Sequence, residues 1–263
     1  MSESPERIIA PALPAATILL VRDRPAFEVL MVKRHHQIDF ASGALVFPGG
    51  KIEPGDSDPA WAGHCRGWEA HPEDERRLRI AALREAFEES GVLLARDHGG
   101  VPWKAVEEAA ASRERIARGE ESFLELVKGL TVQLDLEAMA PFARWITPRM
   151  MPKRFDTWFF IATAPDDQFA VCDGYETVDA EWIAPAEALA MADRGERKII
   201  FPTRMNLKLL AESADAETAL AAARARTQVV VEPWVEVRDG ERYLLLPPGA
   251  GYGPVAEPFS SAM

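Results

Sequence analysis

The sequence predicts an α/β fold, because β-rich runs and amphipathic helices alternate along its 263 residues. Three observations lead to this prediction: two β-rich runs near the start, an amphipathic helix over residues 76–94, and further strands and helices beyond residue 140. Apolar residues make up 48% of the chain, as in ordinary globular proteins, which excludes a disordered chain.

The chain is predicted to begin with paired strands. Residues 16–21 and 28–33 are β-rich runs around the turn-like Asp23-Arg24-Pro25, and together they predict a hairpin. Residues 44–47 form another short apolar run. It ends at Pro48-Gly49-Gly50, which is typical of a loop.

An irregular insertion is expected over residues 56–75, which are rich in Pro, Gly, Asp and Trp and show no clean period. A strong helix follows over residues 76–94. The Ala-, Glu- and Arg-rich stretch 104–129 predicts two short helices that are separated near Gly119.

The second half is predicted to alternate strands and helices up to a final hairpin. The expected strands are 142–147, 157–163 and 181–183, and the expected helices are one beginning at Pro185, then 202–212 and 216–226. Residues 229–237 and 242–246 flank Asp239-Gly240, which favours a hairpin turn.

The acidic composition limits the classes of partner. Asp and Glu number 42 against 30 Lys and Arg, so the formal net charge is −12, which argues against a surface that binds nucleic acid. Residues 1–7 are polar, and no apolar run approaches the roughly 20 residues of a membrane helix. Only Cys65 and Cys172 occur, which fits a reducing compartment. We expect a cytoplasmic protein with no membrane partner, and a homodimer is compatible with the sequence.

Three glutamates of the predicted helix carry the main chemical signal. Glu85, Glu88 and Glu89 are spaced i, i+3 and i+4, so they are neighbours on one helix face. The opposite face is apolar and is expected to be the core face, with Ile80, Leu83, Phe87 and Leu94. Clustered carboxylates suit Mg²⁺ or Mn²⁺, and Arg84 is placed to pair with Glu88. The alternative is an ordinary solvated face.

The segment before this helix strengthens the chemical interpretation. An apolar strand ends in the turn Phe47-Pro48-Gly49-Gly50, whose backbone can lie close to a helix or to a phosphate. A strand, a Gly-Gly loop and a carboxylate helix together predict a site for a diphosphate and a metal. Gly91 is placed to end the turn that carries the carboxylates or to allow a close approach of the backbone.

These residues resemble the Nudix hydrolases, whose box reads G-x5-E-x7-R-E-U-x-E-E-x-G-U, where U is a bulky aliphatic residue. Gly50 matches the first position, and the second half is matched by Arg84, Glu85, Glu88, Glu89, Gly91 and Val92. The sequence departs from the box at Asp56, where Glu is usual, and at the small Ala86. In addition, 27 residues separate Asp56 from Arg84, where the box has seven.

A box interrupted at this point is similar to the branch of the family that contains the mammalian peroxisomal coenzyme A diphosphatase. The resemblance implies a Nudix fold, in which a mixed β-sheet is sandwiched between helices. It implies a Nudix domain over residues 10–195, with an insertion at 57–79 inside the box and a helical insertion at about 103–137. Residues 196–263 would add helices and a hairpin packed on the same domain.

The resemblance implies metal-dependent hydrolysis of a diphosphate in a nucleoside diphosphate-linked compound. Glu85, Glu88, Glu89 and the Gly50 carbonyl would hold Mg²⁺ or Mn²⁺, and Arg84 would orient the carboxylates. Coenzyme A or its thioesters are the expected substrates, with 3′,5′-ADP and (acyl-)4′-phosphopantetheine as products. ADP-ribose, a dinucleotide or a nucleotide sugar is the alternative substrate, and a non-catalytic nucleotide-binding module is the rival class.

Further site residues are expected outside the box. Arg34, Gly49, Gly50 and Arg154 are predicted to contact the substrate, with Lys153 beside Arg154. A fourth carboxylate is expected at Glu176, with Asp173, Asp179 and Glu181 as rivals, and the general base is Glu88, Glu89 or Glu176. Packing is the favoured role for Trp61, Trp68 and Trp103, with base stacking as the alternative, and solvation is favoured for His35 and His36.

Overall fold

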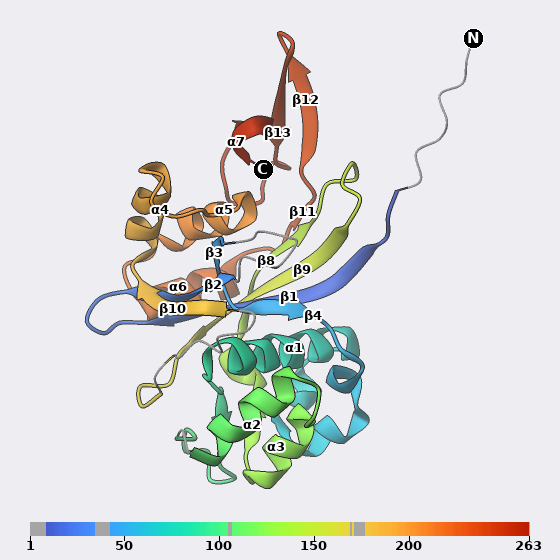
Figure 1. Ribbon diagram of the computed structural model, residues 1–263, viewed down its shortest axis with the longest axis vertical. Coiled ribbons are helices and arrows are strands. Elements are labelled where there is room, and N and C mark those ends of the chain that lie inside the picture. Colours follow the sequence, from blue (N-terminus) through green and yellow to red (C-terminus); the bar gives the residue numbers. More distant parts are fainter. Residues whose placement is uncertain (1–8, 35–42, 105–106, 169, 171–176, 263) are drawn as a thin grey trace.

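The computed structural model describes residues 9–34, 43–104, 107–168, 170 and 177–262. Its main body has three layers, in which helices cover both faces of a central sheet (Figure 1). This confirms the predicted α/β fold with a mixed sheet sandwiched between helices. One face carries α1 (Glu73–Ser90), α2 (Glu107–Ala117) and α3 (Phe123–Gly129), and the other carries α4 (Pro185–Asp193), α5 (Phe201–Leu210) and α6 (Ala216–Ala225).

The central sheet is mixed, and its first two strands in chain order separate after a short paired segment. Its members are β1 (Ala12–Arg22), β2 (Glu28–Arg34), β3 (Leu45–Val46), β4 (Gly49–Lys51), β8 (Ala140–Ile146), β9 (Arg154–Thr163), β10 (Thr177–Ile183) and β11 (Val230–Val231). The path is β10-β2-β1-β9-β8-β11. Strand β1 runs parallel to β9 but pairs with β2 only at Val21 and Arg22. Short strands occupy the split, because β3 pairs with β2 and β4 pairs with β1.

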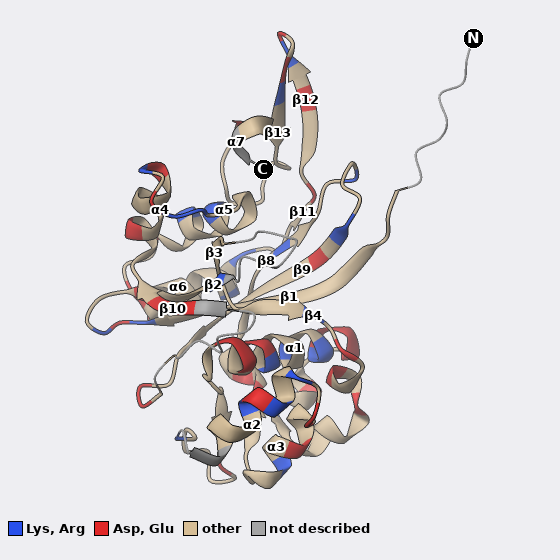
Figure 2. Cartoon of the chain, in the orientation of Figure 1, with Lys and Arg blue, Asp and Glu red and all other residues tan. Residues whose placement is uncertain are grey.

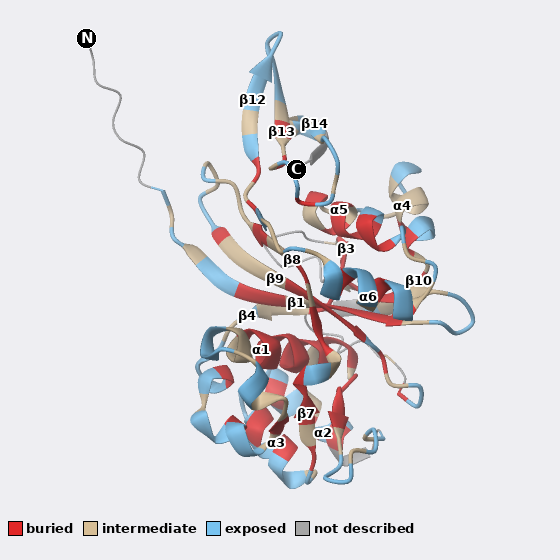
Figure 3. Ribbon diagram, turned by 180° about the vertical axis from the view of Figure 1, so that it is seen from behind, coloured by how far each residue is buried: buried red, intermediate tan, exposed pale blue. Residues whose placement is uncertain are grey.

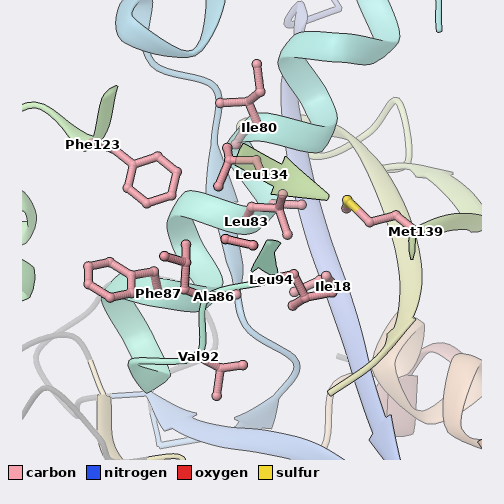
Figure 4. Close-up of a cluster of buried hydrophobic side chains, with 14 of the residues drawn as sticks. Ile18, Ile80, Leu83, Ala86, Phe87, Val92, Leu94, Phe123, Leu134 and Met139 are labelled. Atoms are coloured by element: carbon pink, nitrogen blue, oxygen red, sulfur yellow. The ribbon is translucent and has the colours of Figure 1, made fainter. Parts of the chain in front are cut away.

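Strand β1 shows how the sequence supplies both layers of the core. Side chains alternate between the faces of a strand, so Ile18 and Leu20 join the cluster around α1, whereas Leu19 and Val21 join the cluster under α5 and α6. The buried residues accordingly run through the central strands and along α1, as Figure 3 shows. Figure 4 shows the apolar side chains of α1, including Ile80, Leu83 and Phe87, gathered in the first of these clusters.

Two small sheets complete the fold. Strands β5 (Cys65–Arg66), β7 (Gln133–Asp135) and β6 (Ala95–Arg96) join the insertions beside α1. Strands β12 (Trp234–Arg238), β13 (Glu241–Leu245) and β14 (Ala256–Pro258) form the other sheet, followed by α7 (Phe259–Ala262). The β12–β13 hairpin projects from the body in Figure 1. Its turn residues Asp239 and Gly240 have positive φ values, as the predicted hairpin requires.

Most predicted elements are confirmed, but three segments differ. The helix expected over 76–94 spans Glu73–Ser90, because Gly91 adopts a left-handed conformation that ends it. The expected Gly49-Gly50 loop is strand β4, because its backbone pairs with β1. The strand expected over 229–237 is split into β11 and β12, and Pro233 lies between them.

No helix in the described part of the chain is both long and apolar enough to cross a membrane. Cys65 is buried with a free thiol, and burial raises the pKa of that thiol to about 12. Cys172 lies outside the described residues.

Candidate active site

The last turns of α1 bring the predicted carboxylates together next to β4. Glu85 and Glu89 are buried, and the Glu88 side chain is 16% exposed. The alternative of a solvated acidic face is therefore wrong for this helix. Figure 2 shows acidic and basic residues mixed along α1 rather than segregated. A buried acidic cluster needs compensating partners, since isolated buried charges are costly.

Arg84 is the central partner of this cluster. Its guanidinium donates to both carboxylate oxygens of Asp56, at 2.9 and 3.0 Å, and to the Lys51 carbonyl at 2.8 Å. Its Nη1 also donates to Oε1 of Glu85 at 3.0 Å and of Glu88 at 3.2 Å. Arg84 therefore connects the segment after β4 to two carboxylates of its own helix.

The pKa of Arg84 reflects this setting. Burial alone would lower it, but the hydrogen bond to Asp56 and the charges of Glu85 and Asp56 outweigh burial and raise the pKa. Arg84 therefore stays charged, and its charge is shared among the surrounding carboxylates. Its hydrogen bonds to Asp56, Glu85 and Glu88 leave little of its positive charge for an anionic substrate.

Asp56 fills the place where the Nudix box has Glu. It lies in the 3-10 helix Pro54–Ser57, and its Oδ2 also accepts a hydrogen bond from the Glu53 backbone N–H at 2.7 Å. The short carboxylate reaches Arg84 because this helical turn and α1 are held side by side. The departure of Asp56 from the box therefore preserves the contact with Arg84.

The two glycines of β4 lie beside the carboxylates of α1. The Gly49 backbone N–H donates to Oε2 of Glu89 at 3.0 Å, which fixes that carboxylate. A Cβ atom on Gly50 would overlap the Glu85 carboxylate, and one on Gly49 would overlap Thr17 and the β1 backbone. Space therefore requires glycine at position 49, where the obstacle is backbone, whereas a Cβ atom at position 50 would force the Glu85 carboxylate to move.

Glu88 has the most perturbed carboxylate of the cluster. Burial, together with the charges of Glu53 and Asp56, raises its pKa from 4.5 to about 7 against the opposing effect of Arg84. Its charged form is therefore poorly compensated by the protein at neutral pH. Glu53, whose carboxylate lies 3.9 Å from Arg84, was not assigned to the site from the sequence. The signal in the sequence that could have indicated Glu53 is its position three residues after Gly50.

A model of the NUDT19 Nudix domain matches residues 66–208, which is more than half of the chain. The chain belongs to this Nudix family. The resemblance that the sequence predicted is thereby confirmed, and the Nudix domain model covers α1 with Arg84 and the three glutamates.

Named relatives agree with this assignment. The chain is 28% identical to acyl-coenzyme A diphosphatase NUDT19 of Xenopus laevis over 218 residues, covering 67% of this chain and 57% of the relative. It is also 28% identical to the protein of that name in Homo sapiens over 204 residues, covering 62% and 54%. The putative nudix hydrolase 7 of Caenorhabditis elegans is 29% identical over 201 residues, covering 76% and 61%. The chain thus spans little more than half the length of these relatives.

A solved structure supports the fold over most of the chain. The crystal structure of a Nudix hydrolase from Alicyclobacillus acidocaldarius superposes with a TM-score of 0.72 at 29% identity. It covers 81% of this chain and 97% of that chain. The layered fold of this Nudix hydrolase is therefore shared well beyond the box itself.

The donor set of this Nudix domain fits a hard divalent cation. Glu85, Glu88 and Glu89 offer carboxylate oxygens, the ligand type that Mg²⁺ and Mn²⁺ prefer. The raised pKa of Glu88 marks a buried charge that a cation would compensate. Among the described residues, no group of three His, Cys, Asp or Glu side chains is arranged to hold a metal ion. In this structure Arg84 donates to both Glu85 and Glu88, and the Gly49 N–H donates to Glu89.

Arg154 does not join the glutamates. It is buried, and its guanidinium donates to the Thr147 carbonyl at 2.9 Å, to the Ala10 carbonyl at 2.9 Å and to Glu232 at 2.7 Å. These contacts join the β8–β9 turn to the start of β1 and to the segment before β12. The expected substrate contact is not supported for Arg154, because its donors are engaged inside the protein. Lys153 instead lies over the Phe155 ring at 5.7 Å.

Several of the remaining predicted site residues lie outside the described part of the chain. Glu176 and Asp173 lie outside the described residues, as do His35 and His36. Asp179 is exposed on β10, and Glu181 accepts from Arg197 at 3.3 Å. Arg34 is the last residue of β2, where it pairs with Thr177.

The tryptophans of the insertions pack against the body, as favoured from the sequence. Trp61 is 1% exposed, and its indole N–H donates to the Gly55 carbonyl at 2.9 Å. Trp68 and Trp103 are partly buried against the same cluster, and Arg76 lies over the Trp68 ring at 4.5 Å. The insertions therefore contribute to the core beside α1.

Proposed function

We propose that this Nudix domain hydrolyses the diphosphate linkage of coenzyme A or an acyl-coenzyme A in a reaction that depends on a divalent metal. The products would be 3′,5′-ADP and (acyl-)4′-phosphopantetheine. The observation that carries the reaction class is the buried cluster of Glu85, Glu88 and Glu89 around Arg84, set against Gly49 and Gly50. The substrate class rests on the named relatives from Xenopus laevis and Homo sapiens.

Each residue of the cluster has a defined part in the proposal. Glu85, Glu88, Glu89 and the Gly50 carbonyl would hold Mg²⁺ or Mn²⁺. When bound, such an ion lowers the pKa of coordinated water and neutralises charge that develops on the phosphate oxygens. Arg84 orients Glu85 and Glu88 through Nη1, and the Gly49 N–H fixes Glu89.

Glu88, Glu89 and Glu176 are the candidates for the general base in this proposal. A base works best when its pKa lies near the operating pH. The pKa of about 7 belongs to Glu88 without a metal ion, and a bound cation would lower it, so this pKa does not single out Glu88 among the three.

Charge balance gives a physical reason for the metal. The chain carries a net charge of −12, and a diphosphate is also anionic. The positive charge of Arg84 is already engaged by Asp56, Glu85 and Glu88. An added cation would reverse the local sign and let a diphosphate approach these carboxylates.

The proposal is tested with a panel of substrates. The protein is incubated with Mg²⁺ or Mn²⁺ and with coenzyme A, an acyl-coenzyme A, ADP-ribose, a dinucleotide or a nucleotide sugar, and the products are separated by chromatography. We expect 3′,5′-ADP from the coenzyme A substrates and none in EDTA. Faster cleavage of ADP-ribose would refute the substrate, and no cleavage of any compound would refute the enzyme.

A matched pair of variants tests the location of the site. Glu88→Gln should lower turnover by roughly 10²-fold or more, because it removes a carboxylate from the cluster. Glu73→Gln changes an exposed glutamate of the same helix and should leave turnover unchanged. Equal activity of both variants would show that the metal site lies elsewhere.

A further inference from the structure

The end of α1 carries charges of the wrong sign for a helix C-terminus. The last carbonyls of a helix form the negative end of its dipole, which favours cations there. Helix α1 instead carries Glu88 and Glu89 near this end, and its last turn contains no basic residue. Its final carbonyl groups also lack helical N–H partners. The turn that holds the proposed metal site therefore needs support from outside the helix.

Arg113 supplies that support from the helical insertion. Its Nε donates to the backbone carbonyl of Glu88 at 2.8 Å. A Cβ atom on Gly91 would lie 3.4 Å from Nη1 of Arg113, so the guanidinium lies beside the glycine that ends α1. A cation from α2 thus stands at the carbonyl end of α1.

The placement of Arg113 follows from the packing of α2. Ala109, Ser112 and Ile116 are buried and recur at helical spacing, so this stripe faces the body. Arg113 stands next to the stripe, four residues after Ala109 and three before Ile116. Burial of the stripe therefore brings Arg113 to α1.

The insertions also contact the last turns of α1 through aromatic rings. The Phe123 ring of α3 lies 5.9 Å from Phe87 and 5.7 Å from Trp61, measured between ring centroids. Figure 4 shows Phe87 and Phe123 in the same cluster of buried side chains. Phe87 directly precedes Glu88. The aromatic rings therefore pack against the residue before Glu88, and Arg113 binds the backbone carbonyl of Glu88 itself.

We propose that Arg113 is a positioning residue that holds the Glu88–Glu89 turn in the geometry needed to bind the metal, so that the helical insertion serves the active site. This inference rests on the proposed function, since it concerns the same metal site. Arg113 acts on the backbone of Glu88, whereas Arg84 contacts the carboxylate. Groups that orient metal ligands from outside typically change metal affinity by roughly 10–100-fold when they are removed.

A positioning role and a purely electrostatic role of Arg113 predict opposite changes in metal affinity when Arg113 is removed. If Arg113 acted only as a nearby positive charge, its removal would strengthen the binding of another cation. If it positions the turn, its removal weakens metal binding despite the lost repulsion. Arg113→Met removes both charge and hydrogen bonds, and Arg113→Lys keeps the charge but loses the planar fork.

The experiment measures Mn²⁺ affinity by electron paramagnetic resonance for the full chain and its variants. We expect Arg113→Met to bind Mn²⁺ roughly tenfold more weakly and Arg113→Lys to fall between it and the wild type. Arg118→Met is the matched control, because Arg118 follows α2 and pairs with the exposed Glu114. It should bind Mn²⁺ like the wild type. Urea unfolding in EDTA records the stability of each variant.

Several results would overturn the inference. Unchanged or tighter Mn²⁺ binding by Arg113→Met, with or without lower stability, would reduce Arg113 to a structural contact. If Arg113→Met does not fold, unchanged binding by Arg113→Lys would lead to the same conclusion. A wild type that binds no Mn²⁺ would refute the proposed function and this inference with it. A wild type that binds Mn²⁺ and hydrolyses coenzyme A, beside an unaffected Arg113→Met, would refute the inference alone.

Discussion

Arg84 and Asp56 form a buried, two-pronged ion pair across 28 positions of the sequence, with Nε–Oδ1 at 2.9 Å and Nη2–Oδ2 at 3.0 Å. Their side chains are 5% and 2% exposed. This pair joins the two halves of the Nudix box directly, although an insertion separates them in the chain. The insertion lengthens the connection and leaves the contact between the halves in place.

Breaking this ion pair is expected to be costly. Asp56→Asn leaves the Arg84 charge buried with less compensation, so the free energy of unfolding should fall by about 3 kcal/mol. Turnover should fall as well, because Arg84 would no longer be held at Glu85 and Glu88. The measurement is urea unfolding alongside coenzyme A hydrolysis. Asp166→Asn, at an exposed aspartate, is the control and should change neither.

Glu88 should make stability depend on pH in a defined direction. Its pKa is raised from 4.5 to about 7 in the folded protein. The favourable contribution of its neutral form is therefore present below pH 4.5 and is lost as pH rises through about 7. Without metal, Glu88→Gln should gain stability relative to the wild type between about pH 5 and 8, by at most about 3 kcal/mol.

The measurement for Glu88 is urea unfolding of both proteins in EDTA across that pH range. A stability difference that stays constant with pH would contradict the raised pKa. Repeating the series with Mg²⁺ adds a second comparison. The ion should stabilise the wild type more than Glu88→Gln, because a ligand that binds only the folded state raises its stability.

Gly50 should not tolerate a methyl group. A Cβ atom there would overlap the Glu85 carboxylate, so Gly50→Ala must displace either β4 or that side chain. We expect a loss of about 1–3 kcal/mol in unfolding free energy, as for other overpacked sites, and a strong loss of turnover. Gly55→Ala is the control, because no atom lies within 4 Å of its added Cβ. Equal behaviour of the two variants would contradict the close approach of β4 to α1.

The sequence predicted the strands, the helices and the carboxylate cluster because each of these depends on local pattern. The periodicity of α1 and the i, i+3, i+4 spacing of its glutamates are visible in the chain itself. The strand character of Gly49 and Gly50 was not predicted, because it depends on pairing with β1. The contact of Arg113 with Glu88 was likewise hidden, since it depends on how the insertion packs.

Arg154 shows why a basic residue at the start of a strand is an ambiguous signal. From the sequence it was expected to meet a phosphate, but its donors are used by Thr147, Ala10 and Glu232. Arg154→Met should therefore lower the free energy of unfolding by about 1–3 kcal/mol, because it removes three hydrogen bonds to partly buried acceptors. The KM for coenzyme A should stay at the wild-type value.

Arg149→Met provides the matched control for Arg154. Arg149 contacts the same Glu232 oxygen at 3.2 Å, but its side chain is 70% exposed. Exposed ion pairs contribute little, so this variant should lose less than about 1 kcal/mol. Urea unfolding and substrate titration of both variants separate the two roles of Arg154. A raised KM with unchanged stability in Arg154→Met would instead support a contact between Arg154 and the substrate. A side chain that only makes contacts inside the protein should not change KM without changing stability.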